Sequence, residues 1–258
     1  MSSASIFVLL SIPVIIYGID LFEKKYGSAK AGWLATFPIV GGPAMLIIIL
    51  EHGTAFGSIA AYNASVGMVP WVAFILCYRL SKSVPTWFII LLSIILWLVI
   101  GVALTSIRFS SYWFLLIMAF LVVISFAFGS ITKEQKKQKR SLLFARIGFA
   151  VSLVLLIAYL AEISGERFSG LLITFPIVSA SIMLPLFILG ERDKVHRMTS
   201  GMVIAGPALA SFMISLSFFL DASFTILHTF IFTLLISSSI HYLMLKLVIH
   251  FTRKDHGL

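Results

Sequence analysis

Residues 36–40 read Thr-Phe-Pro-Ile-Val, and the same five residues recur at positions 174–178. The two copies are separated by more than half of the chain, which indicates a duplicated unit and not a local tandem repeat. The match extends outward, since Gly32 corresponds to Gly170. Proline lacks an amide hydrogen and clashes with the preceding helical turn, so each copy predicts a kinked or broken helix.

The composition indicates a helical membrane protein. Charged residues make up 11% of the 258 residues, against about 25% in soluble domains, and 60% are hydrophobic. The few charges separate apolar runs of the ~17–25 residues that cross a bilayer as a helix. We predict an all-α polytopic membrane protein with about nine transmembrane helices, eight and ten being open alternatives. They fall at residues 4–20, 31–50, 54–78, 85–105, 110–129, 143–161, 170–189, 198–219 and 223–250.

Basic residues are concentrated in alternate connections between these helices. One set of connections holds Lys24, Lys25, Lys30, Arg79, Lys82, five basic residues within 133–140, Arg192, Lys194, Arg197, Arg253 and Lys254. The other set holds only Arg108 and Arg167. Because cytoplasmic loops are enriched in Lys and Arg, this asymmetry predicts a cytoplasmic C-terminus and an N-terminus outside. The net charge of +9 then reflects membrane topology, and no nucleic-acid partner is expected.

These orientations give the two pentapeptides opposite directions across the membrane. We therefore predict two inverted four-helix repeats, at residues 1–105 and 142–258. Residues 106–141 would join them as a fifth helix followed by a basic cytoplasmic loop. The first segment lacks the basic region that precedes a cleaved signal, so it is expected to be a retained helix. Whether the last range is one long span or two stays open.

Broken helices at matching positions of two inverted halves indicate the central site of a transporter. The alternative is a purely structural kink, because proline is common in membrane helices. Gly41 and Gly42 follow the first pentapeptide, whereas Ser179 and Ser181 follow the second, which predicts an asymmetric site. The candidate substrate-binding residues are Thr36, Phe37, Pro38, Gly41, Gly42, Tyr62, Asn63, Thr174, Phe175, Pro176, Ser179 and Ser181.

Four acidic residues and two histidines are candidates for gating or ion coupling. They are Asp20, Glu51, Glu162, Glu191, His228 and His241. The four acids fall near the ends of predicted spans, where a helix-end or headgroup-level role is the alternative. The two histidines could line a polar path or make interhelical hydrogen bonds. The sequence contains no metal-binding spacing, phosphate loop or catalytic set, so we predict no enzyme, metal or cofactor, and the single Cys77 is expected to pack.

The first repeat contains Gly32, Phe37-Pro38, Glu51-x-Gly53 and Pro70, in that order. In these motifs it resembles the small GlpM-like bacterial membrane proteins. The second repeat keeps Gly170, Phe175-Pro176 and Pro207, but Glu191 is displaced and the glycine after it is missing. The resemblance implies two fused copies of a unit that otherwise pairs in antiparallel fashion, in a bacterial inner membrane. It also implies a loose association with envelope polysaccharide.

Three functions follow as hypotheses. The first is a transporter that moves a small polar or anionic metabolite by alternating access. The second is a lipid or lipid-linked-sugar translocase, with Arg79, Lys82, Arg146 and Arg197 as headgroup-binding residues. The third is a non-transporting accessory subunit of an envelope polysaccharide complex. The expected partners are membrane lipids and an unidentified solute or lipid, with a homodimer or an envelope-synthesis partner left open.

Overall fold

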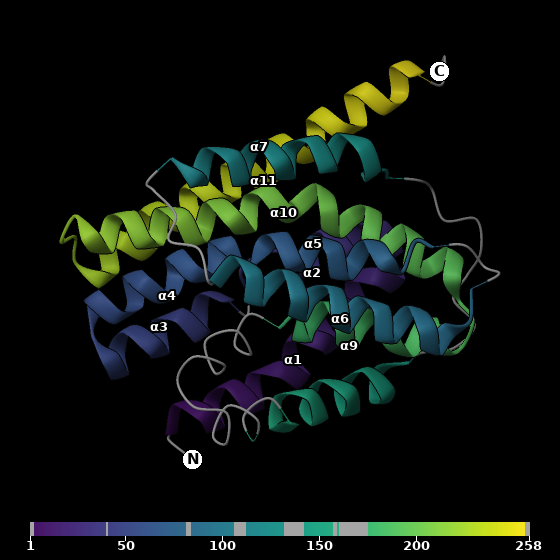
Figure 1. Cartoon of the computed structure of the whole chain (residues 1–258), viewed down its shortest axis with the longest axis horizontal. Helices are drawn as coiled ribbons and strands as arrows, with labels where there is room; N and C mark the ends of the chain where they lie inside the picture. Colours follow the sequence, from purple (N-terminus) through teal and green to yellow (C-terminus); the bar gives the residue numbers. More distant parts are fainter. Residues whose placement is uncertain are drawn as a thin grey trace.

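A computed structural model describes residues 3–39, 41–80, 84–105, 112–131, 142–156, 159 and 175–255. Every regular element in this part of the chain is an α-helix (Figure 1). The elements are α1 (Ser3–Tyr26), α2 (Ser28–Ala35), α3 (Gly41–His52), α4 (Thr54–Val66), α5 (Met68–Cys77), α6 (Thr86–Thr105), α7 (Trp113–Phe128), the helix Leu143–Leu156, α9 (Ile177–Ile188), α10 (Arg192–Asp221) and α11 (Ile226–Asp255).

The helices have the length and apolar surface of membrane spans. In the described residues, four helical segments are long and apolar enough to cross a bilayer: Thr54–Cys77, Thr86–Leu104, Arg192–Asp221 and Ile226–Phe251. Four shorter apolar helices accompany them. Large apolar side chains of α6 are exposed along its length, including Trp87, Leu91, Leu98 and Val102. Such a surface suits lipid, and the chain is an all-helical membrane protein.

The observed helices lie on the predicted ranges, with informative differences. The range 31–50 is divided into α2 and α3, so the predicted break of the helix at the first pentapeptide is confirmed. The range 54–78 is divided at Gly67, which lies between α4 and α5. The first helix was predicted to end at residue 20, and α1 instead continues to Tyr26. This end point was wrong because the charges after residue 20 are partly buried and paired, as described below.

Helix α10 forms the centre of the bundle. One side of α10 packs against α7 and α11, and the opposite side packs against α2 and α4 (Figure 1). The approach of α2 is especially close, because a Cβ added at Gly201 would lie 1.8 Å from the carbonyl oxygen of Ala29. A Cβ at Gly32 would lie 2.1 Å from the carbonyl oxygen of Met198. Only glycine permits this contact between two helix backbones.

Proline within α10 leaves a carbonyl that a neighbouring helix satisfies. Pro207 has no amide hydrogen, so the carbonyl of Val203, four residues earlier, loses its helical partner. The hydroxyl of Ser125 on α7 donates to this carbonyl at 2.6 Å. One turn along, Ser237 of α11 donates to the carbonyl of Ala208 at 2.8 Å. These buried bonds fix α7 and α11 against α10.

The connections gather at two ends of the bundle. Helix α3 runs toward the end where α4 begins, and α10 and α11 are joined at that same end (left in Figure 1). Helix α9 runs toward the opposite end, where α10 begins (right in Figure 1). The reversals at Gly53 and Gly190 use φ angles of 85° and 77°, which favour glycine.

Candidate functional site

The two proline motifs adopt the same backbone turn. In each copy the amide after the proline donates to the carbonyl before it, at 2.6 Å for Ile39 to Phe37 and 2.7 Å for Ile177 to Phe175. In each copy the proline carbonyl then accepts the amide four residues later, at 2.9 Å from Gly42 and 2.8 Å from Ala180. Pro176 has φ −76° and ψ 60°, an inverse γ-turn. A helix begins directly after each turn.

The first motif meets a buried histidine from the last helix. The imidazole of His241 stacks on Trp33 at a centroid distance of 4.0 Å and contacts the edge of Phe37 at 5.1 Å. His241 is buried, and neither ring nitrogen has a hydrogen-bond partner in the described structure. The hydroxyl of Thr36 donates to the carbonyl of Gly32 at 3.1 Å. The motif therefore places a polar ring beside the helix break, among aromatic side chains.

The glycines after the first motif are covered by α10. A Cβ at Gly41 would lie 3.1 Å from the methyl group of Met213, and one at Gly42 would lie 3.6 Å from the ring of Phe212. Both glycines lie at the start of α3, where the chain resumes helical geometry. The side chains of α10 thus close over the predicted binding residues in this conformation.

The second motif has different surroundings. Phe175 contacts Phe74 at 5.6 Å and Trp97 at 5.0 Å between ring centroids. Ser179 accepts a hydrogen bond from Nε1 of Trp71 at 3.1 Å. The hydroxyl of Ser181 donates to the carbonyl of Ile177 at 2.6 Å. The predicted asymmetry between the copies is therefore present in the side chains around them.

Three further candidates, Tyr62, Asn63 and Thr174, lie away from the two turns or outside the described residues. Tyr62 on α4 is half-buried and packs against the main core, whereas the neighbouring Asn63 is exposed. The structure does not bring Asn63 into the interior. Pro176 is buried at the centre of the second turn, whereas Thr174 lies outside the described residues.

A buried polar row runs along α11. Its members are spaced four residues apart: Thr229, Thr233, Ser237 and His241. Ser237 bonds to α10, whereas the hydroxyls of Thr229 and Thr233 have no partner in the part of the chain that is described. His228 is exposed instead, with Nδ1 2.7 Å from the hydroxyl of Thr225. The predicted polar path through both histidines therefore includes His241 but not His228.

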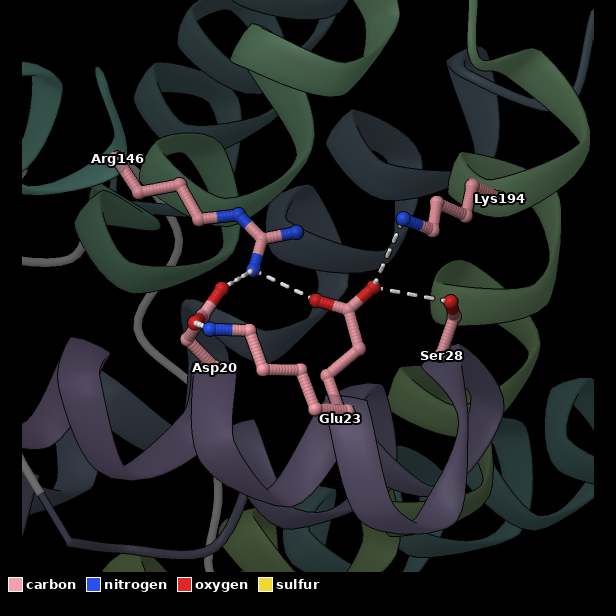
Figure 2. Close-up of polar contacts among 6 residues, drawn as sticks. Asp20, Glu23, Ser28, Arg146 and Lys194 are labelled. Atoms are coloured by element: carbon pink, nitrogen blue, oxygen red, sulfur yellow. Dashed lines mark hydrogen bonds and ion pairs between the residues drawn. The ribbon is translucent and has the colours of Figure 1, made fainter. Parts of the chain in front are cut away.

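A cluster of buried charges joins three helices (Figure 2). Nη1 of Arg146 donates to Glu23 at 2.6 Å and to Asp20 at 3.3 Å. Nζ of Lys194 on α10 lies 3.7 Å from the Glu23 carboxylate, and Ser28 donates to that carboxylate at 3.0 Å. Four of the charged side chains are buried: Asp20, Glu23, Arg146 and Lys194. The fifth, Lys24, pairs with Asp20 at 2.7 Å and is 42% exposed.

This ion cluster corrects the role predicted for Arg146. A headgroup-binding arginine would be exposed at the bilayer surface, but Arg146 is fully buried against two carboxylates. Arg79 is likewise engaged, donating to the carbonyl of Phe128 at 2.6 Å and to Ser200 at 3.0 Å. Lys82 lies outside the described residues, and Arg197 is half-buried.

Sequence reasoning found Asp20 but missed its partners. Glu23 follows Asp20 by three residues and so shares its helix face, a spacing that could have indicated a paired site. Glu51 and Glu191 are exposed beside helix ends, in line with the helix-end alternative. Glu162 lies outside the described residues. Within those residues, no group of three or more His, Cys, Asp and Glu side chains is arranged to hold a metal ion.

The resemblance to GlpM-like proteins, carried by Gly32, Phe37-Pro38, Glu51-x-Gly53 and Pro70, stays a prediction. Comparison with protein-family models, curated proteins and solved structures finds no match to this chain.

Proposed function

We propose that this protein is a membrane transporter that moves a small polar or anionic solute by alternating access. The observation that carries the proposal is the matched turn at Pro38 and Pro176, which interrupts or begins a helix in each half of the chain. Interrupted helices at equivalent positions expose backbone groups that can bind a solute within the membrane. A lone proline kink would not repeat both hydrogen bonds of the turn.

The proposed topology has nine passes in two inverted repeats. In this arrangement α2 with α3, and α4 with α5, each form one interrupted span. We call the end of the bundle that carries Lys24, Arg79 and Arg192 the basic end. The first motif then lies on a span that starts at the basic end, and α9 runs back toward that end. The opposite directions of α3 and α9 in Figure 1 support inverted copies. The positions of Lys24, Arg79 and Arg192 near the ends of α1, α5 and α9 support a single cytoplasmic face.

The solute site would lie between the first motif and α11. His241 offers two ring nitrogens that have no partner among the described residues, and Phe37 of the motif lies against the ring. Buried polar groups without partners cost free energy, so they are typical of positions kept for function. Phe212 and Met213 cover Gly41 and Gly42 in this conformation, and their movement would open the site.

The ion cluster would be the gate at the basic end. It joins α1, the helix Leu143–Leu156 and α10, which belong to both proposed repeats. Separating these helices requires several buried ion pairs to break at once. This favours two discrete conformations, closed and open, over a continuous range of intermediate ones. The conformation described here would be closed at the cytoplasmic side.

The test is solute uptake into proteoliposomes. A panel of radiolabelled small carboxylates, phosphate esters and amino acids would be offered to the wild type and to a Pro38→Ala/Pro176→Ala double variant. We expect uptake by the wild type and its loss in the double variant, because restored amides would extend the helices through both turns. Pro13→Ala in α1 is the matched control, since this proline lies outside both motifs. Equal uptake by wild type and double variant would remove the role given to the motif.

A further inference from the structure

We propose that one edge of the Arg146 guanidinium binds the carboxylate or phosphate group of a small solute. This edge carries Nε and Nη2. The identification of the ligand as a solute rests on the proposed transport function. The binding of an oxyanion does not require transport and can be measured on its own.

Among the described residues, the guanidinium donates hydrogen bonds from one of its three nitrogens. Nη1 donates to both Asp20 and Glu23, whereas Nε and Nη2 have no hydrogen-bond partner among the described residues. The side chain is fully buried. Burying an unpaired charged donor costs more free energy than burying a neutral one, so two such donors in one side chain indicate an acceptor that binds there.

The two free nitrogens lie on one edge of the group. Figure 2 shows the carboxylates of Asp20 and Glu23 on the other side of the guanidinium, around Nη1. Nε and Nη2 direct their N–H bonds in parallel, in the fork that matches the two oxygens of a carboxylate or phosphate. A spherical anion such as chloride cannot use this geometry as well. The edge therefore selects oxyanions.

The charge of the ion cluster favours an anion as well. Among the described residues, two carboxylates and three cations meet here, a net charge of +1. The four buried charges balance, so the excess positive charge is that of Lys24, which is 42% exposed, and a monoanion would bring the whole cluster to neutrality. Asp20 and Glu23 would then hold the guanidinium in place, and Lys194 would add a second buried cation near the ligand.

A ligand would reach the free edge of Arg146 by movement of the helix that carries it. The helix Leu143–Leu156 packs on α1 through a small apolar cluster that includes Ile12, Ile16 and Ala150, and its Phe149 and Leu153 pack against the main core. Its other side is exposed at Phe144 and Leu155. In the proposed transport cycle, separation of these contacts would uncover the free edge.

The experiment measures ligand-induced thermal stabilisation of the full chain in detergent. The probes are sodium acetate, succinate, phosphate and chloride at equal ionic strength, together with short-chain phosphatidic acid as a lipid phosphate. A ligand that binds the folded state raises its unfolding temperature. We expect saturable stabilisation by at least one soluble oxyanion and none by chloride.

Three variants assign the effect to Arg146. Arg146→Lys keeps the charge but removes the fork, and should weaken oxyanion binding by at least ~10-fold. Glu23→Gln removes a competing negative charge and should strengthen binding several-fold, an effect that a merely structural role would not produce. Lys25→Gln is the control, because Lys25 is exposed on the same turn of α1 and has no place in the ion cluster.

Each outcome decides the proposal. Absence of oxyanion stabilisation in the wild type, or unchanged affinity in Arg146→Lys and Glu23→Gln, would overturn it. Stabilisation by phosphatidic acid alone would overturn the assignment to a solute. Uptake of a neutral solute without oxyanion binding would support the transport function and overturn the proposed oxyanion site. Oxyanion binding without uptake of any solute would support the oxyanion site and overturn the transport function.

Discussion

The close approach of α2 and α10 gives a sharp test of the structure. Replacing Gly201 by alanine would place a Cβ 1.8 Å from the carbonyl oxygen of Ala29 and 2.8 Å from the amide nitrogen of Trp33. Both neighbours are backbone atoms, so no side-chain rotation can relieve the contact. The two helices would have to part by roughly 1 Å, which forfeits a quarter to a half of the dispersion energy of each contact along the interface.

The expected loss follows from this geometry. Overpacking of a filled interior costs about 1–3 kcal/mol, and a clash with backbone falls at the upper end of that range. The matched control is Gly206→Ala on the same helix, where the new Cβ would lie 3.4 Å from the Trp71 ring and 3.7 Å from Leu121. These are ordinary contacts, and alanine favours a helix over glycine by about 1 kcal/mol. The control should be neutral or stabilising.

The assay can use the only cysteine of the chain. Cys77 is buried, so a maleimide dye that fluoresces on reaction reports unfolding as the protein is heated. Gly201→Ala should lower the labelling temperature by roughly 6–12 °C, because a loss of about 3 kcal/mol corresponds to about 2–4 °C per kcal/mol. If Gly201→Ala unfolded at the same temperature as Gly206→Ala, the packing of α2 against α10 described here would be wrong.

Three further predictions use the same labelling assay. Arg146→Met should destabilise the fold by about 3–5 kcal/mol, because it leaves buried carboxylates without their main partner, whereas Lys24→Met at the exposed edge should cost less than about 1 kcal/mol. Ser125→Ala should lower the free energy of unfolding by about 1 kcal/mol or more in the wild type. The loss should be smaller in a Pro207→Ala background, because the restored amide of residue 207 satisfies the carbonyl of Val203. Losses that simply add in the double variant would contradict this account. His241→Leu should raise stability by about 1–3 kcal/mol and abolish solute uptake, because it removes a buried polar ring that has no hydrogen-bond partner among the described residues; a less stable variant would show that the ring is satisfied.

The helical segments of this protein follow from local sequence. An apolar run of bilayer length must be helical, because lipid offers its backbone no hydrogen-bond partner. The break at Pro38 is equally local, since proline cannot donate and two glycines follow it. The end of α1 could not be placed in the same way. Charges after residue 20 indicate the bilayer surface, unless distant residues neutralise them.

The partners of those charges show most clearly what could not be predicted from the sequence. Arg146 lies more than 120 residues from Asp20 and near the start of the predicted span 143–161, so a role at the bilayer surface was the natural prediction. Likewise, the sequence marked both histidines of α11, but only the packing of α10 and α2 buries His241 and leaves His228 exposed.

The sequence by itself therefore determined the class of the protein, most of its helices and the repeated proline turns. These depend on hydrophobicity and on the missing amide of proline, which are properties of short segments. Tertiary structure alone decided which charges are buried together, which glycines permit close helix contact and which edge of Arg146 has no partner among the described residues. Those properties depend on contacts between segments far apart in the chain, and no local pattern encodes them.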